Sequence, residues 1–249
     1  MILLYFIVGL VLASFINASA YRLRKGLELK DFVIRPSHCE KCKRDLRWFD
    51  LIPVLSYLIF KGRCSQCKAP VYWYYPISEL VLGISFASLY YGSFTWEYYV
   101  TLPIIFFLSY WDVKDKSIPK QVTDALLVFS LIIAVISVIS EFSSSNIFRV
   151  LIPVVLLGVW GIINWGKEKM GWGDLIIFMS LILAHGVAFG LSVLFFTILA
   201  GGVWGIILVV KDRENRKKYI PLVPFILIGF VLAINTVEHI KTYLFLPNL

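Results

Sequence analysis

The sequence lacks the patterns of a cleavable signal peptide, of a repeat protein and of a dinucleotide-binding loop. Its first apolar run has no basic segment before it and no small-residue exit of the A-x-A type, so it does not resemble a cleavable signal peptide, and we expect a retained helix. No internal repeat or low-complexity stretch is evident, which argues against a repeat architecture. A glycine-rich nucleotide-binding fingerprint after a strand is also absent, so the sequence predicts no dinucleotide-binding loop.

Long apolar runs are what the sequence has instead. Of its 249 residues, 59% are apolar, whereas soluble proteins contain about 45–50% apolar residues. The mean hydropathy is +0.80, so lipid is the main solvent of this chain. Because a membrane-spanning helix needs about 20 apolar residues, the sequence offers eight candidate spans, at 2–21, 77–93, 96–111, 122–140, 147–165, 174–191, 193–210 and 220–237. We therefore predict an all-α, polytopic membrane protein with about eight transmembrane helices.

The basic residues are unevenly distributed among the connections between these spans. Of the 24 Lys and Arg residues, only Arg149 and Lys241 fall on one side, and the other 22 lie in the alternate connections at 22–76, 112–121, 166–173 and 211–219. An excess of Lys and Arg marks the cytoplasmic loops of membrane proteins. The pattern predicts basic loops in the cytoplasm and both termini outside. It also accounts for the net charge of +8 without a nucleic-acid partner, and makes the lipid bilayer the expected partner.

The chain is expected to have three parts. Residues 1–21 form the first transmembrane helix, residues 22–76 form a polar cytoplasmic domain, and residues 77–249 form a helical bundle. All four cysteines lie in the polar part, where a reducing compartment disfavours disulfides. A domain below about 70–80 residues commonly needs a structural metal to be stable.

The cysteines have the spacing of a metal site. Two Cys-x2-Cys pairs, Cys39 with Cys42 and Cys64 with Cys67, are separated by 21 residues, which is close to the four-cysteine structural zinc pattern. The alternatives are four unligated thiols and a redox role. A closed site of four thiolates leaves no open coordination position, so the predicted zinc is structural and does no chemistry.

Two aspartates are the candidate catalytic residues. Asp174 follows Gly171 and Gly173 at the start of a predicted span, and Asp112 lies at the end of another, both on the predicted cytoplasmic face. The simpler explanation makes Asp174 a helix N-cap or a first-turn acid that faces the helix dipole. It makes Asp112 a solvated boundary acid paired with a lysine, similar to Asp115 and Asp124. If the two carboxyls lie close together, they share a proton and one can activate water while the other donates to the leaving amine.

The motifs, in this order, resemble the type IV prepilin peptidases, which are bifunctional leader peptidases and N-methyltransferases. The resemblance extends over nearly the whole chain. It rests on Ser14-Phe15-Ile16-Asn17, Arg35-Pro36-Ser37 with the cysteine pairs, Leu51-Ile52-Pro53-Val54-Leu55-Ser56-Tyr57, Tyr75-Pro76-Ile77-Ser78-Glu79-Leu80, Asp112 with Ile118-Pro119, Gly171-Trp172-Gly173-Asp174, and Pro221-Leu222-Val223-Pro224. The sequence departs from the family pattern at Asp50, Lys114, Lys120 and Ile176.

The resemblance implies a bacterial cytoplasmic-membrane enzyme that acts on pilin-like precursors. It would make Asp112 and Asp174 the catalytic pair that removes a short basic leader after a glycine, at the cytoplasmic membrane face. Many relatives then methylate the new N-terminus with S-adenosylmethionine. For that second activity Glu79 is the first candidate residue, followed by Asn17 and Arg22, although Glu79 could instead pair with a basic residue for structure.

Three other functions remain open from the sequence. The chain could be a Gly-x-Gly-Asp membrane protease without methyltransferase activity, or a non-catalytic scaffold whose zinc domain docks a pilus or secretion partner. A transporter would need coupling groups near the bilayer midplane, where the sequence has few.

Overall fold

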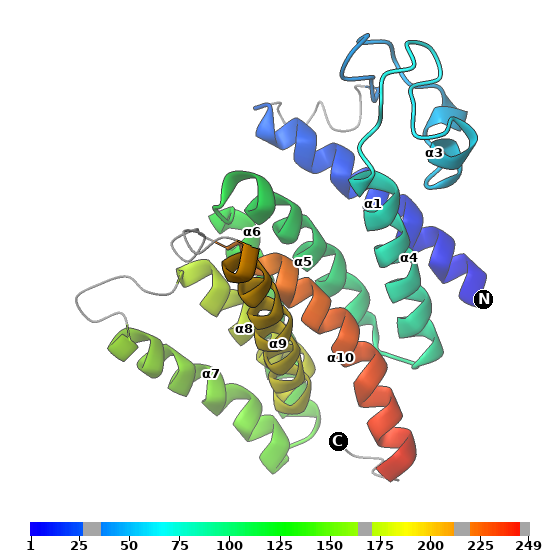
Figure 1. Cartoon of the computed structure of the whole chain (residues 1–249). Coiled ribbons are helices and arrows are strands. Elements are labelled where there is room, and N and C mark those ends of the chain that lie inside the picture. The colour runs from blue at the N-terminus through cyan, green and yellow to red at the C-terminus, as the bar shows by residue number, and fades with distance from the viewer. Residues whose placement is uncertain (27–35, 164–170, 212–219, 245–249) are drawn as a thin grey trace. The chain divides into compact units, whose positions relative to one another are not determined.

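The structure is a computed structural model that describes residues 1–26, 36–163, 171–211 and 220–244, with side chains described up to residue 236. The described residues are helical, with no strand among them and with two isolated β-bridges. The elements are α1 (Ile2–Arg24), the 3-10 helix η1 (Trp48–Asp50), α3 (Leu55–Ile59), α4 (Tyr74–Tyr91), α5 (Trp96–Asp115), α6 (Lys120–Ser140), α7 (Ser144–Ile163), α8 (Trp172–His185), α9 (Val187–Lys211) and α10 (Val223–Leu244) (Figure 1).

The predicted all-α class is confirmed, and helices occur at each of the predicted apolar segments. Four of them, α1, α6, α7 and α9, are long and apolar enough to cross a membrane. The predicted span at 174–191 has different bounds in the structure. Gly186, with φ of 87°, ends α8 after His185, and α9 begins at Val187. Apart from His185 and Gly186, the residues around this break are apolar, so hydropathy alone did not locate it.

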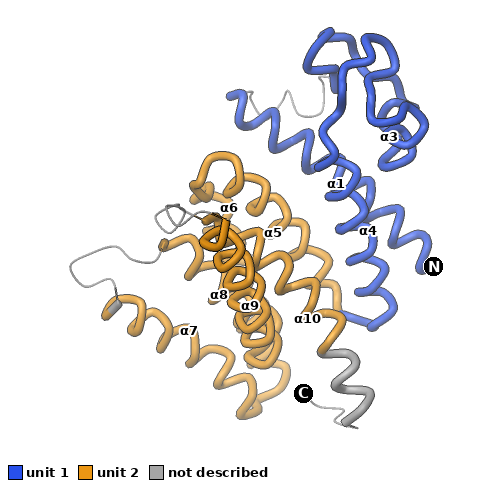
Figure 2. The backbone as a smooth tube through the Cα atoms, viewed as in Figure 1, with its two compact units in different colours: residues 1–94 blue, residues 95–249 orange. Residues whose placement is uncertain are grey.

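The chain divides into two compact units, residues 1–94 and residues 95–249 (Figure 2). The first unit contains α1, the cysteine-containing segment and α4. In this unit α1 packs along α4 at glycine contacts. A Cβ atom added to Gly9 would lie 2.7 Å from the Leu82 carbonyl oxygen and 2.8 Å from the Gly83 Cα atom. Small residues at such a crossing let two helix backbones approach closely, as is common between membrane helices.

In the second unit, α8 is the most enclosed helix. It packs against α6, α7 and α9, and every residue from Asp174 to Ala184 is buried. The side chain of Arg149 closes its C-terminal end by donating hydrogen bonds to the carbonyl oxygens of Leu183 and Ala184. A cation at this end satisfies carbonyl groups that have no partner within the helix. Helix α8 is thus fixed at one end by Arg149 and carries Asp174 at the other.

Candidate active site and metal centre

Asp112 is fully buried in the last turn of α5. Its Oδ2 atom accepts a hydrogen bond of 3.0 Å from the backbone N–H of Val223, the first residue of α10. Its Oδ1 atom is also buried and has no hydrogen-bond partner within the described ranges. Asp115, three residues later in the same helix, is exposed. Burial therefore distinguishes Asp112, the predicted catalytic acid, from Asp115, which is a boundary acid of similar sequence context.

Asp174 lies in the first turn of α8 and is 9% exposed. Gly171, not Asp174, is the N-cap residue, and the helix has no side-chain capping bond, so of the two simpler positions the structure excludes the N-cap and agrees with the first-turn acid. The Oδ1 atom of Asp174 is buried without a partner in the part of the chain that is described. The Asp112 carboxyl lies close enough to interact electrostatically with it. The second unit therefore brings together two buried acids, each with an unused oxygen.

The two glycines before Asp174 stand where a side chain would crowd Asp174 itself or Ile118. A Cβ atom on Gly171 would lie 3.2 Å from Oδ2 of Asp174. On Gly173 it would lie 2.9 Å from Cδ1 and 3.3 Å from Cβ of Ile118, in the segment that links α5 to α6. Both contacts are tighter than ordinary carbon contacts of about 3.5–4.0 Å. The glycines thus allow the start of α8 to approach the chain that follows Asp112.

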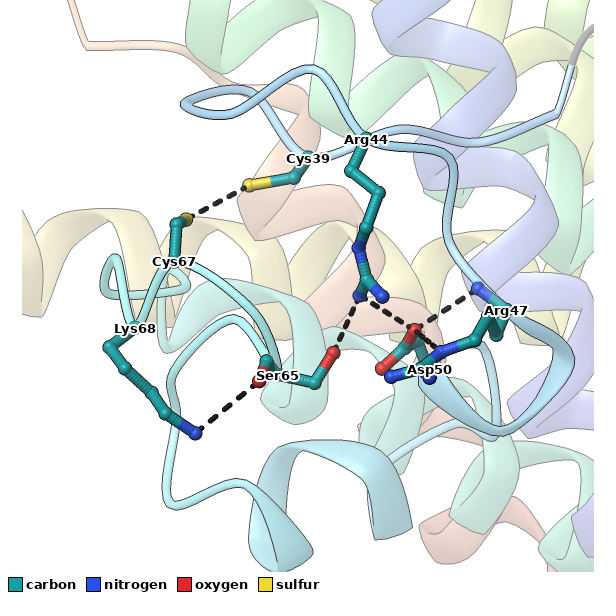
Figure 3. Close-up of polar contacts among 7 residues, drawn as sticks. All are labelled: Cys39, Arg44, Arg47, Asp50, Ser65, Cys67 and Lys68. Carbon is teal, nitrogen blue, oxygen red and sulfur yellow. Dashed lines mark hydrogen bonds and ion pairs between the residues drawn. The ribbon is translucent and has the colours of Figure 1, made fainter.

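The four cysteines of the first unit form one cluster, with sulfur atoms that all lie within 4.8 Å of one another. The Sγ atoms of Cys39 and Cys67 are 3.9 Å apart (Figure 3). A tetrahedral zinc with Zn–S bonds of about 2.3 Å places its sulfur ligands about 3.8 Å apart. The donor set and its size fit zinc.

Two similar turns build this cluster. In the first, the N–H of Lys43 donates to the Cys39 carbonyl and Cys39 N–H donates to the Arg44 carbonyl. In the second, Lys68 N–H donates to Cys64, and Cys64 N–H donates to Ala69. Lys43 and Lys68 both have left-handed backbones, with φ of 59° and 57°. The repeated turn explains why the two cysteines of each Cys-x2-Cys pair lie close together.

The surroundings of the cluster favour the thiolate at Cys64, whereas at Cys67 the N–H of Ala69 lowers the pKa but the neighbouring thiols raise it to about 11. Burial would raise the pKa of the Cys64 thiol, but the backbone N–H groups of Cys67 and Gln66, together with the neighbouring thiols, lower it to about 6. The thiolate is the form that binds metals. Arg44 connects the two turns by donating to Asp50 at 3.0 Å and to the Ser65 hydroxyl at 2.6 Å (Figure 3).

A cavity of about 700 Å³ lies in the first unit, and all three predicted methyltransferase residues line it. Asn17 and Arg22 come from α1, and Glu79 comes from α4. Asn17 and Glu79 are buried, and the Arg22 guanidinium donates to the Ser37 hydroxyl at 3.1 Å. The cysteine turns and the aromatic residues Tyr57, Phe60, Tyr72, Trp73 and Tyr75 provide other walls.

Sequence reasoning missed two backbone donors at these sites. Val223 binds Asp112, and the N–H of Val54 donates to Oε2 of Glu79 at 2.8 Å. From the sequence we expected Glu79 either to serve the methyltransferase activity or to pair with a basic residue for structure. Among the described residues, Glu79 forms no ion pair.

These features define an all-helical membrane protein with a buried pair of carboxyls and a cluster of four thiols. Residues 7–93 match the model of the bacterial peptidase A24 N-terminal domain, and residues 99–206 match that of the type IV leader peptidase family. The chain belongs to the type IV leader peptidase family. Asp112 and Asp174 lie in the second matched region, and the cysteines, Asn17, Arg22 and Glu79 lie in the first.

Similar proteins extend the match over nearly the full chain. A prepilin leader peptidase/N-methyltransferase of Bacillus subtilis is 29% identical over 94% of this chain and 93% of its own length. Proteins of the same name from Vibrio cholerae and Stutzerimonas stutzeri are 28% and 27% identical, over 95% and 92% of this chain and 97% and 88% of their own. No solved structure matches the chain significantly.

Proposed function

We propose that this chain is an aspartic endopeptidase that removes the short basic leader from type IV pilin-like precursors and then methylates the new N-terminus. The observation that carries the proposal is the pair of buried, electrostatically interacting carboxyls of Asp112 and Asp174 within the matched leader peptidase region. Relatives over most of the chain bear both activities in their names.

The two acids have different environments, which supports different roles. The Val223 N–H stabilises negative charge on Asp112 at Oδ2, and Oδ1 has no partner among the described residues. We assign Asp112 as the base that takes a proton from water, whose oxygen forms a bond to the scissile carbonyl carbon. Asp174 starts protonated and donates to the carbonyl oxygen. When the C–N bond breaks, the proton on Asp112 passes to the leaving amine nitrogen, a hydroxyl proton of the tetrahedral intermediate returns to Asp174, and the pair again carries one proton, on Asp174.

The proposed topology keeps eight spans, with the basic connections and the catalytic acids on the cytoplasmic side of a bacterial inner membrane and both termini outside. Under this topology, a precursor with one apolar helix in the bilayer and a basic leader in the cytoplasm presents its scissile bond at the depth of the acids. In the proposed division into residues 1–21, 22–76 and 77–249, the middle part is a domain stapled by zinc at Cys39, Cys42, Cys64 and Cys67. This zinc is structural, because four thiolates close its coordination sphere.

For methylation, the cavity of the first unit fits the donor by size and by chemistry. Ligand pockets are commonly about 300–1,000 Å³, and this cavity measures about 700 Å³. S-adenosylmethionine, when bound, supplies an electrophilic methyl group. Arg22 is a suitable partner for a carboxylate of the ligand, and Glu79 and Asn17 are suitable partners for an amine.

The test is co-expression of the chain with a pilin-like precursor and measurement of the product by intact mass. Wild type should remove the leader and add about one methyl mass, whereas Asp112→Asn and Asp174→Asn should leave the precursor whole. Asp115→Asn is the matched control, because this acid is exposed in the same helix, and it should cleave normally.

Three other outcomes have clear meanings. Cleavage that survives both active-site substitutions refutes the assignment of the acids. Leader loss without methylation leaves a protease only. Normal pilus or secretion assembly with either Asn variant favours a scaffold.

A further inference from the structure

The cavity of the first unit contains a buried hydrogen-bond acceptor with no donor. Asn17 is 2% exposed, and its Nδ2 donates to the Ser78 hydroxyl oxygen at 2.9 Å. The Ser78 hydroxyl proton is used in turn on the Tyr75 carbonyl oxygen, at 2.8 Å. Ser78 can therefore only accept from Asn17, which fixes the orientation of the amide. It leaves Oδ1 of Asn17 buried and unpartnered within the described chain.

Glu79 places a carboxylate in the same cavity. It is 7% exposed, it accepts the Val54 N–H, and the Ser14 hydroxyl also bonds to it. The described residues provide no cation to pair with it. The two neutral donors satisfy only part of its hydrogen-bonding capacity, and a buried carboxylate without a cationic partner remains costly. Its surroundings therefore favour a positively charged ligand.

The aromatic walls strengthen this preference. Tyr57, Trp73 and Tyr75 line the cavity with Asn17 and Glu79. Aromatic faces attract cations, and this attraction increases when the cation is removed from water. An acceptor-only amide oxygen, a carboxylate and aromatic rings together match a group that is cationic and only donates hydrogen bonds. A primary ammonium has that chemistry.

We propose that Asn17 and Glu79 form a binding subsite for a primary ammonium in the first-unit cavity. This inference rests on the proposed function, which offers two sources of such a group. One is the new N-terminal amine of the cleaved precursor, and the other is the amino-acid end of S-adenosylmethionine. Either ligand would place a primary ammonium against the same acceptors, Oδ1 of Asn17 and the carboxylate of Glu79.

The experiment measures binding directly, with purified full-length protein in lipid nanodiscs. One pair of probes is S-adenosylhomocysteine, which keeps the ammonium, and 5′-methylthioadenosine, which lacks it. The second pair is a peptide with the mature N-terminus of a pilin-like precursor and its N-acetylated form. Equilibrium dialysis gives a Kd for each probe with wild type, Glu79→Gln and Asn17→Ala. The exposed acid Glu141, outside the cavity, supplies the control Glu141→Gln.

We expect Glu79→Gln to weaken one ammonium-bearing probe about tenfold or more, and Asn17→Ala to weaken the same probe by a smaller factor. The partner probe without the ammonium should bind equally to wild type and both variants. An effect on S-adenosylhomocysteine identifies the donor as the source, and an effect on the free-amine peptide identifies the substrate.

The proposal is overturned if neither ammonium probe binds wild type, if both variants bind them as wild type does, or if the probes without an ammonium lose affinity equally. Leader cleavage is measured on the same samples. The melting temperature of each variant, compared with that of Glu141→Gln, shows whether the chain is folded. Absent cleavage by wild type would refute the proposed peptidase without changing the outcome of the binding measurement.

Discussion

Gly173→Ala tests whether the approach of α8 to Ile118 sets the geometry of the two acids. The new Cβ would lie 2.9 Å from Cδ1 of Ile118, so an ordinary contact requires a movement of about 0.5 Å or more. Misplacement by about 1 Å at an active site can cost about 100-fold in rate. We therefore expect about a tenfold loss of leader cleavage, because Asp174 follows Gly173 directly in the same helical turn.

The assay is the initial rate of precursor cleavage in nanodiscs, with the amount of folded protein matched among variants. Ile118→Val removes the Cδ1 atom that the new methyl group would meet, so the double variant Gly173→Ala with Ile118→Val should recover most of the lost rate. Such a recovery is a coupling between neighbours in a double-mutant cycle. Gly202→Ala is the control, because its Cβ would meet nothing within 4 Å.

Either of two results would refute this reasoning. Full activity of Gly173→Ala would mean that the contact has no effect on the acids. A double variant as slow as Gly173→Ala alone would mean that the loss has a cause other than the clash with Ile118.

The remaining predictions concern the metal, the helix crossing and the support of Asp112. Purified protein should contain about one zinc per chain by elemental analysis, and Cys64→Ser should lower both the zinc content and the melting temperature. Gly9→Ala should destabilise the first unit by about 1–3 kcal/mol in unfolding experiments, since its Cβ would meet backbone atoms of α4. Gly158→Ala, which meets nothing within 4 Å, should be neutral or stabilising by up to about 1 kcal/mol; equal effects of the two changes would contradict the close crossing. Val223→Pro removes the N–H that Asp112 accepts at a helix position where proline is tolerated. Since a hydrogen bond to a charged group contributes about 1.5–3 kcal/mol, cleavage should fall at least tenfold, and an unchanged rate would show that this donor is unimportant.

The sequence predicted the helices well because their signal is strong. Runs of apolar residues long enough to cross a bilayer leave few alternatives to helix, since lipid cannot satisfy an open backbone. The break at Gly186 was missed because long, mainly apolar runs lie on both sides of His185-Gly186, and the positive φ of the glycine marks the end of α8. The sequence thus predicted the fold class, but it did not predict where α8 ends.

The four-cysteine cluster was also accessible from the sequence, for a different reason. Each Cys-x2-Cys pair forms a local turn, and the turns at Cys39 and Cys64 use the same hydrogen bonds. Local geometry of this kind depends on near neighbours in the chain. The connection of the two turns through Arg44, Asp50 and Ser65 depends on residues up to 21 positions apart, and no pattern in the sequence indicated it.

The support of the two functional acids was missed for a reason that applies to both sites. Asp112 accepts an N–H from Val223, 111 positions away, and Glu79 accepts one from Val54, 25 positions away. Every residue except proline carries a backbone N–H, so neither donor leaves a side-chain signature. A motif can identify an acid, but the donor that stabilises its charge is selected by the fold. Asp115 and Asp112 are the same residue type three positions apart in α5, and only the buried one is met by the start of α10. The chemistry of these acids therefore depends on which backbone reaches them as well as on their identity.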